Sequence, residues 1–153
     1  MNVVGFLHVH DPHIACSKDI NDLFSDSLLN NEKLPEISNY LENGVSIVRY
    51  ISNLYDTDGE LIGPNIIYTD GLWVWPSYYS FYLKKYPQIL IPEELQSRIG
   101  LNLGKIISLS QGEKGYIEYL TGKMLGIRLP SGYKLSPDIS TIIKERGDTV
   151  TCY

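Results

Sequence analysis

Apolar and polar residues alternate most clearly in the middle of the chain. Three runs are rich in β-branched and aromatic residues: Val45 to Leu54, Leu61 to Thr69 and Leu72 to Trp75. Asp-Thr-Asp-Gly at 56–59 separates the first two, and Asp70-Gly71, a dipeptide typical of two-residue hairpin turns with positive φ, separates the last two. This pattern predicts an antiparallel β-meander over about residues 45–75. Gly63-Pro64 predicts a bulge or a sheet edge within the second strand.

Helical spacing of apolar residues, together with start and stop signals, predicts four helices around this meander. They cover about residues 34–42, 77–86, 92–99 and 137–146. Ser77 is the predicted N-cap of the second helix, Gly100 is predicted to end the third, and Ser136-Pro137 opens the fourth. Helices combined with an antiparallel meander make the predicted fold class α+β.

Other segments give weaker signals. Three short apolar runs are predicted as strands: Val3 to Val9, Lys105 to Leu109 and Leu125 to Leu129. Ser17 is expected to cap a short helix from Asp19 to Phe24, a polar loop with Asn30-Asn31 follows, and the tail from Thr149 to Tyr153 is predicted to add an edge strand. Tyr116 to Leu120 fits either a strand or a helix, because a short apolar run has no distinguishing period.

The length of the chain indicates a single domain, and its apolar runs and cysteines indicate a cytoplasmic protein. The 153 residues fit one domain spanning 1–153, long enough to bury a core without covalent staples. We expect no membrane partner, because no apolar stretch approaches the roughly 20 residues of a spanning helix, and the first residues lack a basic region typical of a signal peptide. Cys16 and Cys152 form no Cys-x-x-Cys motif, so they are predicted to be unpaired thiols of a cytoplasmic protein.

The charge balance narrows the choice of partners. The formal net charge is −5 and the sequence pI is near 5.1. Nucleic-acid binding requires a basic patch, so no nucleic-acid partner is expected. A mildly acidic surface is in most proteins a means of staying soluble. The more specific hypothesis is a surface that meets a basic protein.

All three histidines lie in one short segment. His8, His10, Asp11 and His13 could supply metal ligands, because two histidines one residue apart on a strand share a face. The corresponding metal-dependent hydrolases need further ligands from distant strands, and no histidine follows residue 13. The sequence also lacks a Gly-x-Ser-x-Gly elbow and a glycine-rich phosphate loop. A small metal-dependent enzyme is therefore the alternative, and the leading prediction is a protein without catalysis or cofactor.

An aromatic segment from residue 68 to residue 82 is the most unusual feature. Trp73 and Trp75 are predicted to share one face of a strand, and the following helix carries Tyr78 and Tyr79. One interpretation is an aromatic core where hairpin and helix pack. The other is an exposed patch for a partner, because Trp and Tyr dominate binding hot spots. A homo-oligomer formed through this aromatic face is a further possibility.

Four segments carry a resemblance to a known family. They are Tyr-Leu-Glu-Asn-Gly at 40–44, Tyr-Thr-Asp-Gly-Leu-Trp-Val-Trp-Pro at 68–76, Tyr-Leu-Lys-Lys-Tyr at 82–86 and Ile-Pro-Glu-Glu-Leu at 91–95. Over about residues 35–100 the chain resembles small bacterial cytoplasmic proteins similar to immunity proteins of contact-dependent and polymorphic toxin systems. The resemblance implies binding of a cognate toxin domain and its inhibition by occlusion. It assigns no contact residue.

From the residues themselves we predict a partner-binding site on the aromatic unit and the first turn. The predicted contacts are Trp73, Trp75, Tyr78 and Tyr79, with Asp56, Asp58 and Glu60 as charges that steer a basic partner.

Overall fold

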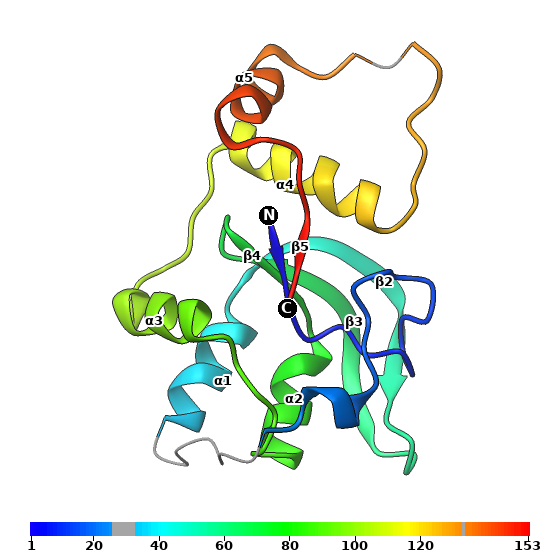
Figure 1. The fold of residues 1–153 in the computed structure, drawn as a ribbon, viewed down its shortest axis with the longest axis vertical. Coiled ribbons are helices and arrows are strands. Elements are labelled where there is room, and N and C mark those ends of the chain that lie inside the picture. The colour runs from blue at the N-terminus through cyan, green and yellow to red at the C-terminus, as the bar shows by residue number, and fades with distance from the viewer. Residues whose placement is uncertain (26–32, 133) are drawn as a thin grey trace.

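The predicted meander forms the larger part of one five-stranded sheet (Figure 1). The computed structural model describes residues 1–25, 33–132 and 134–153. Its strands are β1 (Asn2–Val3), β2 (Val45–Tyr55), β3 (Leu61–Thr69), β4 (Trp73–Pro76) and β5 (Thr151–Cys152). In the order β2-β3-β4-β1-β5, the first three strands are antiparallel, whereas β1 runs parallel to both β4 and β5. The sheet is therefore mixed and mostly antiparallel.

Helices cover both faces of this sheet. The α-helices are α1 (Leu34–Glu42), α2 (Tyr78–Lys85), α3 (Glu93–Asn102), α4 (Gln111–Met124) and α5 (Pro137–Arg146), and η1 (Ile20–Leu23) is a 3-10 helix. In Figure 1, α1, α2 and α3 lie on one side of the sheet and α4 and α5 on the other. The four predicted helices and the α+β class are confirmed.

Alternation along β4 divides the core into two clusters. Trp73 and Trp75 face the cluster formed with α1, α2 and α3, whereas Val74 faces the cluster formed with α4. Val74 and Trp75 are fully buried, so the short β4 strand is the hydrophobic centre of the molecule. The predicted separation of the two tryptophans from Val74 is confirmed.

Three predicted strands are wrong or too long. The first strand ends at Val3, because Gly5 has a φ of +76° and a Cβ there would lie 2.4 Å from the Tyr79 ring. Residues 105–109 and 125–129 lie outside the strands. The ambiguous run from Tyr116 to Leu120 belongs to α4. The tail does form an edge strand, β5.

Local turn and cap predictions were also partly wrong. The β3–β4 connection contains three residues, 70–72, and only Gly71 has a positive φ. Ser77 occupies the predicted N-cap position of α2 but makes no side-chain capping bond, because its hydroxyl donates to the Pro64 carbonyl at 2.7 Å. Helix α3 continues past Gly100 to Asn102. Register shifts between β2 and β3 show that Gly63-Pro64 belongs to a bulged region of an interior strand.

The short helix predicted from Asp19 to Phe24 is present as the 3-10 helix η1, but its predicted cap is wrong. Ser17 does not cap η1; its hydroxyl donates to the Ile14 carbonyl at 2.8 Å. The predicted loop at Asn30-Asn31 lies outside the described residues. Among the helices of the described ranges, none is both long and apolar enough to span a bilayer.

The prediction of two unpaired thiols is wrong. Cys16 and Cys152 form a disulfide across a sequence separation of 136 residues. No sequence motif predicts this pairing, because the two cysteines come together only when β5 pairs with β1 in the folded sheet. The bond fixes the C-terminal strand to the loop that follows the histidine cluster.

Candidate functional site

The four predicted aromatic contacts are core residues. Trp73, Trp75, Tyr78 and Tyr79 are each at most 2% exposed. The Trp75 indole donates to the Leu41 carbonyl at 2.9 Å, so its polar atom is also satisfied inside the molecule. These side chains offer no surface to a partner or to a second copy, and the structure corrects their assignment as contacts. The core interpretation of the aromatic segment is the correct one.

The structure instead brings the histidine segment against α2. The Tyr78 hydroxyl donates to Asp11 Oδ2 at 2.6 Å and accepts from the Leu7 amide at 2.9 Å. His10 Nε2 lies 3.0 Å from the Tyr82 hydroxyl, and its ring is 4.5 Å from that of Tyr78. These contacts span about seventy residues of sequence and hold the N-terminal loop on the helix.

Burial and charge oppose each other in shifting the pKa of His10 but act together on the pKa of Tyr78. Burial lowers the pKa of His10, while the nearby carboxylates of Asp11 and Asp56 oppose that shift. Burial also raises the pKa of Tyr78, and the charge of Asp11 adds to the increase. Neutral His10 and protonated Tyr78 are therefore the forms that the folded protein favours.

The turn between β2 and β3 presents the predicted steering charges. The Asp56 side chain is inaccessible to solvent, and its Oδ1 accepts from the amides of Asp58 at 3.0 Å and Glu60 at 2.8 Å. Its Oδ2 binds the Lys85 ammonium, and this hydrogen bond lowers the pKa of Asp56. Asp56 therefore organises the turn, and only Asp58 and Glu60 are exposed to a partner.

Lys85 is held by both charge and aromatic rings. Its Nζ lies 2.7 Å from the Asp58 carboxylate and 3.9 Å from that of Glu60. It also lies 6.0 Å from the Phe81 ring centroid and 5.9 Å from that of Tyr86, within the range of cation–π attraction. Hydrogen bonds to Asp56 and Asp58 raise the pKa of Lys85. This part of the surface favours a cation.

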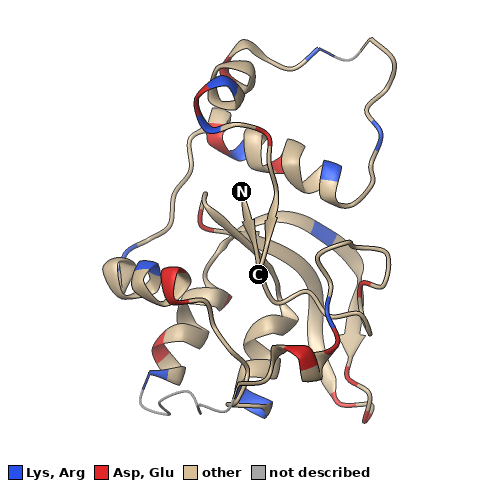
Figure 2. Ribbon diagram, in the orientation of Figure 1, with Lys and Arg blue, Asp and Glu red and all other residues tan. Residues whose placement is uncertain are grey.

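A cavity of about 300 Å³ lies beside this group, between the N-terminal loop, η1, the β2–β3 turn and α2. We call it the acidic cleft; its lining residues are Leu7, Val9, Asp19, Ile20, Asn21, Asp22, Thr57, Tyr82 and Tyr86. The Tyr82 and Tyr86 rings are nearly parallel, with centroids 6.2 Å apart. Figure 2 shows the acidic residues of η1 and of the β2–β3 turn at the same end of the molecule.

The charges lining the cleft are not neutralised within the described chain. Asp19 and Asp22 are exposed, and neither forms an ion pair with any residue that the structure describes. The cleft therefore combines free carboxylates with tyrosine rings. The helical spacing of Tyr82 and Tyr86 was visible in the sequence, but no local signal pointed to Asp19 and Asp22.

The predicted metal ligands do not converge. His8 is exposed and its Nδ1 lies 2.9 Å from the Ser17 hydroxyl, His10 Nε2 is engaged by Tyr82, and His13 is exposed. Across residues 1–25, 33–132 and 134–153, no group of three His, Cys, Asp or Glu side chains is arranged to hold a metal ion. The histidine segment serves here to position the loop.

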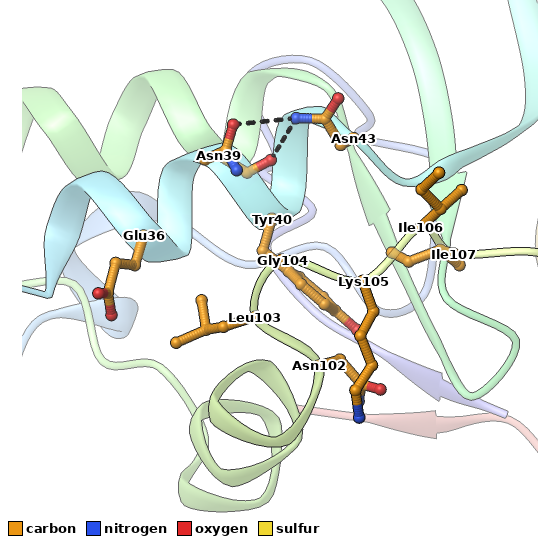
Figure 3. A pocket seen from close by; sticks show the side chains of 10 residues that line it. All are labelled: Glu36, Asn39, Tyr40, Asn43, Asn102, Leu103, Gly104, Lys105, Ile106 and Ile107. Carbon is orange, nitrogen blue, oxygen red and sulfur yellow. Dashed lines mark hydrogen bonds between the residues drawn. The ribbon is translucent and has the colours of Figure 1, made fainter.

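A second hollow of about 330 Å³ lies between α1 and the segment after α3 (Figure 3). Three of its polar side chains bond to backbone carbonyls one helical turn earlier. Asn43 Nδ2 donates to the Asn39 carbonyl at 2.7 Å, Asn102 Nδ2 to the Arg98 carbonyl at 2.8 Å, and Lys105 Nζ to the Leu101 carbonyl at 2.6 Å. These side chains cap helix ends, so the acidic cleft is the stronger candidate site.

Comparisons of the chain with protein-family models, with curated proteins and with solved structures found no match.

Proposed function

We propose that the protein is a non-enzymatic binding protein whose acidic cleft receives a basic side chain of a partner protein. The observation that carries the proposal is that one cavity combines the Tyr82 and Tyr86 rings with the Asp19 and Asp22 carboxylates, which form no ion pair within the described ranges of the chain. A guanidinium group suits such a site, because it can pair with a carboxylate and stack on an aromatic ring. The neighbouring Lys85 shows this chemistry within the chain.

The surrounding charge favours the same partner. Asp58 and Glu60 at the β2–β3 turn extend the negative surface beyond the cleft, and the whole chain carries a net charge of −5. Complementary fields accelerate association and select against acidic partners. A partner with a basic surface is therefore attracted before it makes contact.

The resemblance to immunity proteins suggests the class of partner and the mode of inhibition. We propose a cognate toxin domain as the partner and inhibition by occlusion as the mechanism, in the manner of an immunity protein. A cytoplasmic location belongs to the same proposal. Cysteine usage does not support that location, because Cys16 and Cys152 form a disulfide and are not free thiols.

The binding proposal is tested with a tagged protein expressed in its native host, followed by mass spectrometry of the proteins that co-purify. The cleft variant is Asp19→Asn/Asp22→Asn. The matched control, Glu118→Gln/Asp138→Asn, removes two exposed acids from α4 and α5. We expect one stoichiometric partner with a basic surface to be retained by the wild type and the control, and retained at least about tenfold less by the cleft variant.

The possible results separate the parts of the proposal. Equal retention by both variants would show that the partner binds elsewhere. The absence of a stoichiometric partner would count against the binding function itself. Chemical-shift changes at Tyr82 and Tyr86 on titration with N-acetylarginine amide, but not with the neutral citrulline analogue, would identify the cleft as a guanidinium site.

A further inference from the structure

The segment Thr149–Tyr153 lies along the edge of the sheet. Within it, β5 pairs in parallel with β1, so that Val3 lies opposite Cys152 (Figure 1). The Thr151 amide donates to the Met1 carbonyl at 2.9 Å, and the Tyr153 amide donates to the Val3 carbonyl at 2.9 Å. The Tyr153 ring packs on Trp73 with centroids 4.7 Å apart. This segment, which we call the C-terminal strap, covers the outer edge of β1.

The strap is also held by the Met1 ammonium, which donates to the Thr149 carbonyl at 2.9 Å, and by packing of the partly buried Val150 and Tyr153 on the two core clusters. Its strand contains two residues, Thr151 and Cys152, and both are exposed. Short exposed strands at the edge of a sheet open locally unless something fastens them. The covalent fastening here is the bond from Cys152 to Cys16. Cys16 itself is buried and belongs to the second core cluster, so it is a fixed anchor.

The two ends of the disulfide differ in access. Cys152 lies on the exposed strap, whereas Cys16 is 7% exposed. We therefore expect a thiolate reagent to reach the bond from the strap side. When the bond is broken, Cys152 can move away with the strap, whereas Cys16 stays in the core.

We propose that the C-terminal strap is a redox-controlled element, closed on β1 when the disulfide is formed and released when a dithiol reduces it. A thiolate of the dithiol attacks Cys152 Sγ, forms a mixed disulfide and expels the Cys16 thiolate, which takes up a proton. The second thiol of the dithiol then closes on the first and frees the Cys152 thiol. In total, two electrons and two protons pass to the protein, and the dithiol becomes a disulfide.

Release has a defined structural consequence. The amides of Thr151 and Tyr153 lose their acceptors, the outer edge of β1 opens, and Trp73 loses the ring that covers it. The rest of β1 stays in place, because the Val4 amide donates to the Val74 carbonyl at 3.1 Å on the other side of the strand. The two sides of β1 therefore report separately on release and on unfolding.

The test is hydrogen exchange measured by NMR on the full chain, oxidised and then reduced with dithiothreitol. We expect exchange of the Thr151 and Tyr153 amides to become at least about tenfold faster on reduction and to approach the rate of an unprotected amide. The Val4 amide should remain protected, although its exchange also accelerates as global stability falls. Tryptophan emission should shift to longer wavelength as Trp73 becomes exposed. The double variant Cys16→Ser/Cys152→Ser should behave like the reduced protein with or without reductant.

Three results would overturn the proposal. Unchanged exchange at Thr151 and Tyr153 would mean that the strap stays closed without the bond. Loss of protection at Val4 as well would mean that the disulfide maintains the whole fold. Alkylation of two thiols after treatment with an oxidant would mean that the bond does not form.

Discussion

Several of the twelve tyrosines satisfy polar groups inside this protein through their hydroxyls, whereas the three phenylalanines have no polar atom to offer. Tyr78 bridges the Leu7 amide and Asp11, Tyr40 donates to Asp70 Oδ2 at 2.7 Å, and Tyr116 donates to the Gly147 carbonyl at 2.9 Å. Each ring fills core volume while its hydroxyl joins segments that are distant in sequence. Among the described residues, the buried Tyr79 hydroxyl has no such partner.

The Tyr78→Phe variant tests the bridging role. Removal of the Tyr78 hydroxyl leaves the Leu7 amide and the Asp11 carboxylate without the partner that they share. We therefore expect the free energy of unfolding to fall by about 1–3 kcal/mol. Urea denaturation measures the change. Tyr79→Phe is the matched control, and it should be neutral or stabilising because it removes a buried hydroxyl that has no partner. Equal losses in both variants would refute the assignment.

His10 should make stability depend on pH. Burial lowers its pKa in the folded protein, so between that value and the ordinary value of about 6.5 the unfolded chain binds more protons. The free energy of unfolding therefore increases with pH across this window and is lost as pH falls through it. Urea denaturation from about pH 7.5 to about pH 5 should show this dependence weakened in His10→Gln.

The control for that measurement is His13→Gln, which removes an imidazole from an exposed position of the same loop. It should retain the pH dependence of the wild type. If His10→Gln also retains it, His10 is not the group responsible.

At the scale of elements, close approach between secondary structures selects particular residues. Gly44 connects α1 to β2, and a Cβ at this position would lie 2.7 Å from the Trp75 ring and 2.9 Å from the Tyr68 Cβ. The Trp75 ring cannot easily move, because it is fully buried and its indole is bonded to Leu41. The junction therefore requires glycine for space, and its φ is not positive.

The Gly44→Ala variant should accordingly be destabilised by overpacking. We expect a loss of about 1–3 kcal/mol in the free energy of unfolding. Gly100→Ala is the matched control: it lies inside α3 with open space around the added methyl, and should stabilise by up to about 1 kcal/mol. Thermal unfolding distinguishes the two, and a neutral Gly44→Ala would contradict the packing argument.

At the scale of the whole molecule, one sheet separates two hydrophobic clusters, and one disulfide joins the ends of the chain. The N-terminal loop, the β2–β3 turn and α2 meet at one end to form the acidic cleft. The disulfide closes a loop spanning 136 residues of separation, which restricts the unfolded chain far more than a local bond would.

We therefore expect Cys16→Ser/Cys152→Ser to lower the free energy of unfolding by about 2–5 kcal/mol relative to the oxidised wild type. The variant should still unfold cooperatively in guanidinium chloride, with a larger denaturant dependence because its unfolded state exposes more surface. Wild type kept in dithiothreitol is the matched comparison and should coincide with the variant. No difference from the oxidised protein would show that the bond does not stabilise the fold.

The sequence by itself determined the α+β class, the meander and four of the helices, because these depend on residues a few positions apart. The capping box of α4 was also local: Ser110 and Glu113 bond reciprocally, a signal that could have decided the ambiguous helix. The faces of β4 followed from strand alternation alone. Candidate charges at Asp58 and Glu60 were likewise readable from a turn.

Only the tertiary structure decided which aromatic residues are buried, which cysteines meet and which acids surround the cleft. Trp73 and Trp75 are core residues because helices cover that face of β4, and composition cannot distinguish a covered face from an open one. Cys16 meets Cys152 through the parallel pairing of β1 with β5, a contact between opposite ends of the chain. Such contacts depend on the packing of distant elements, which local sequence preferences do not encode.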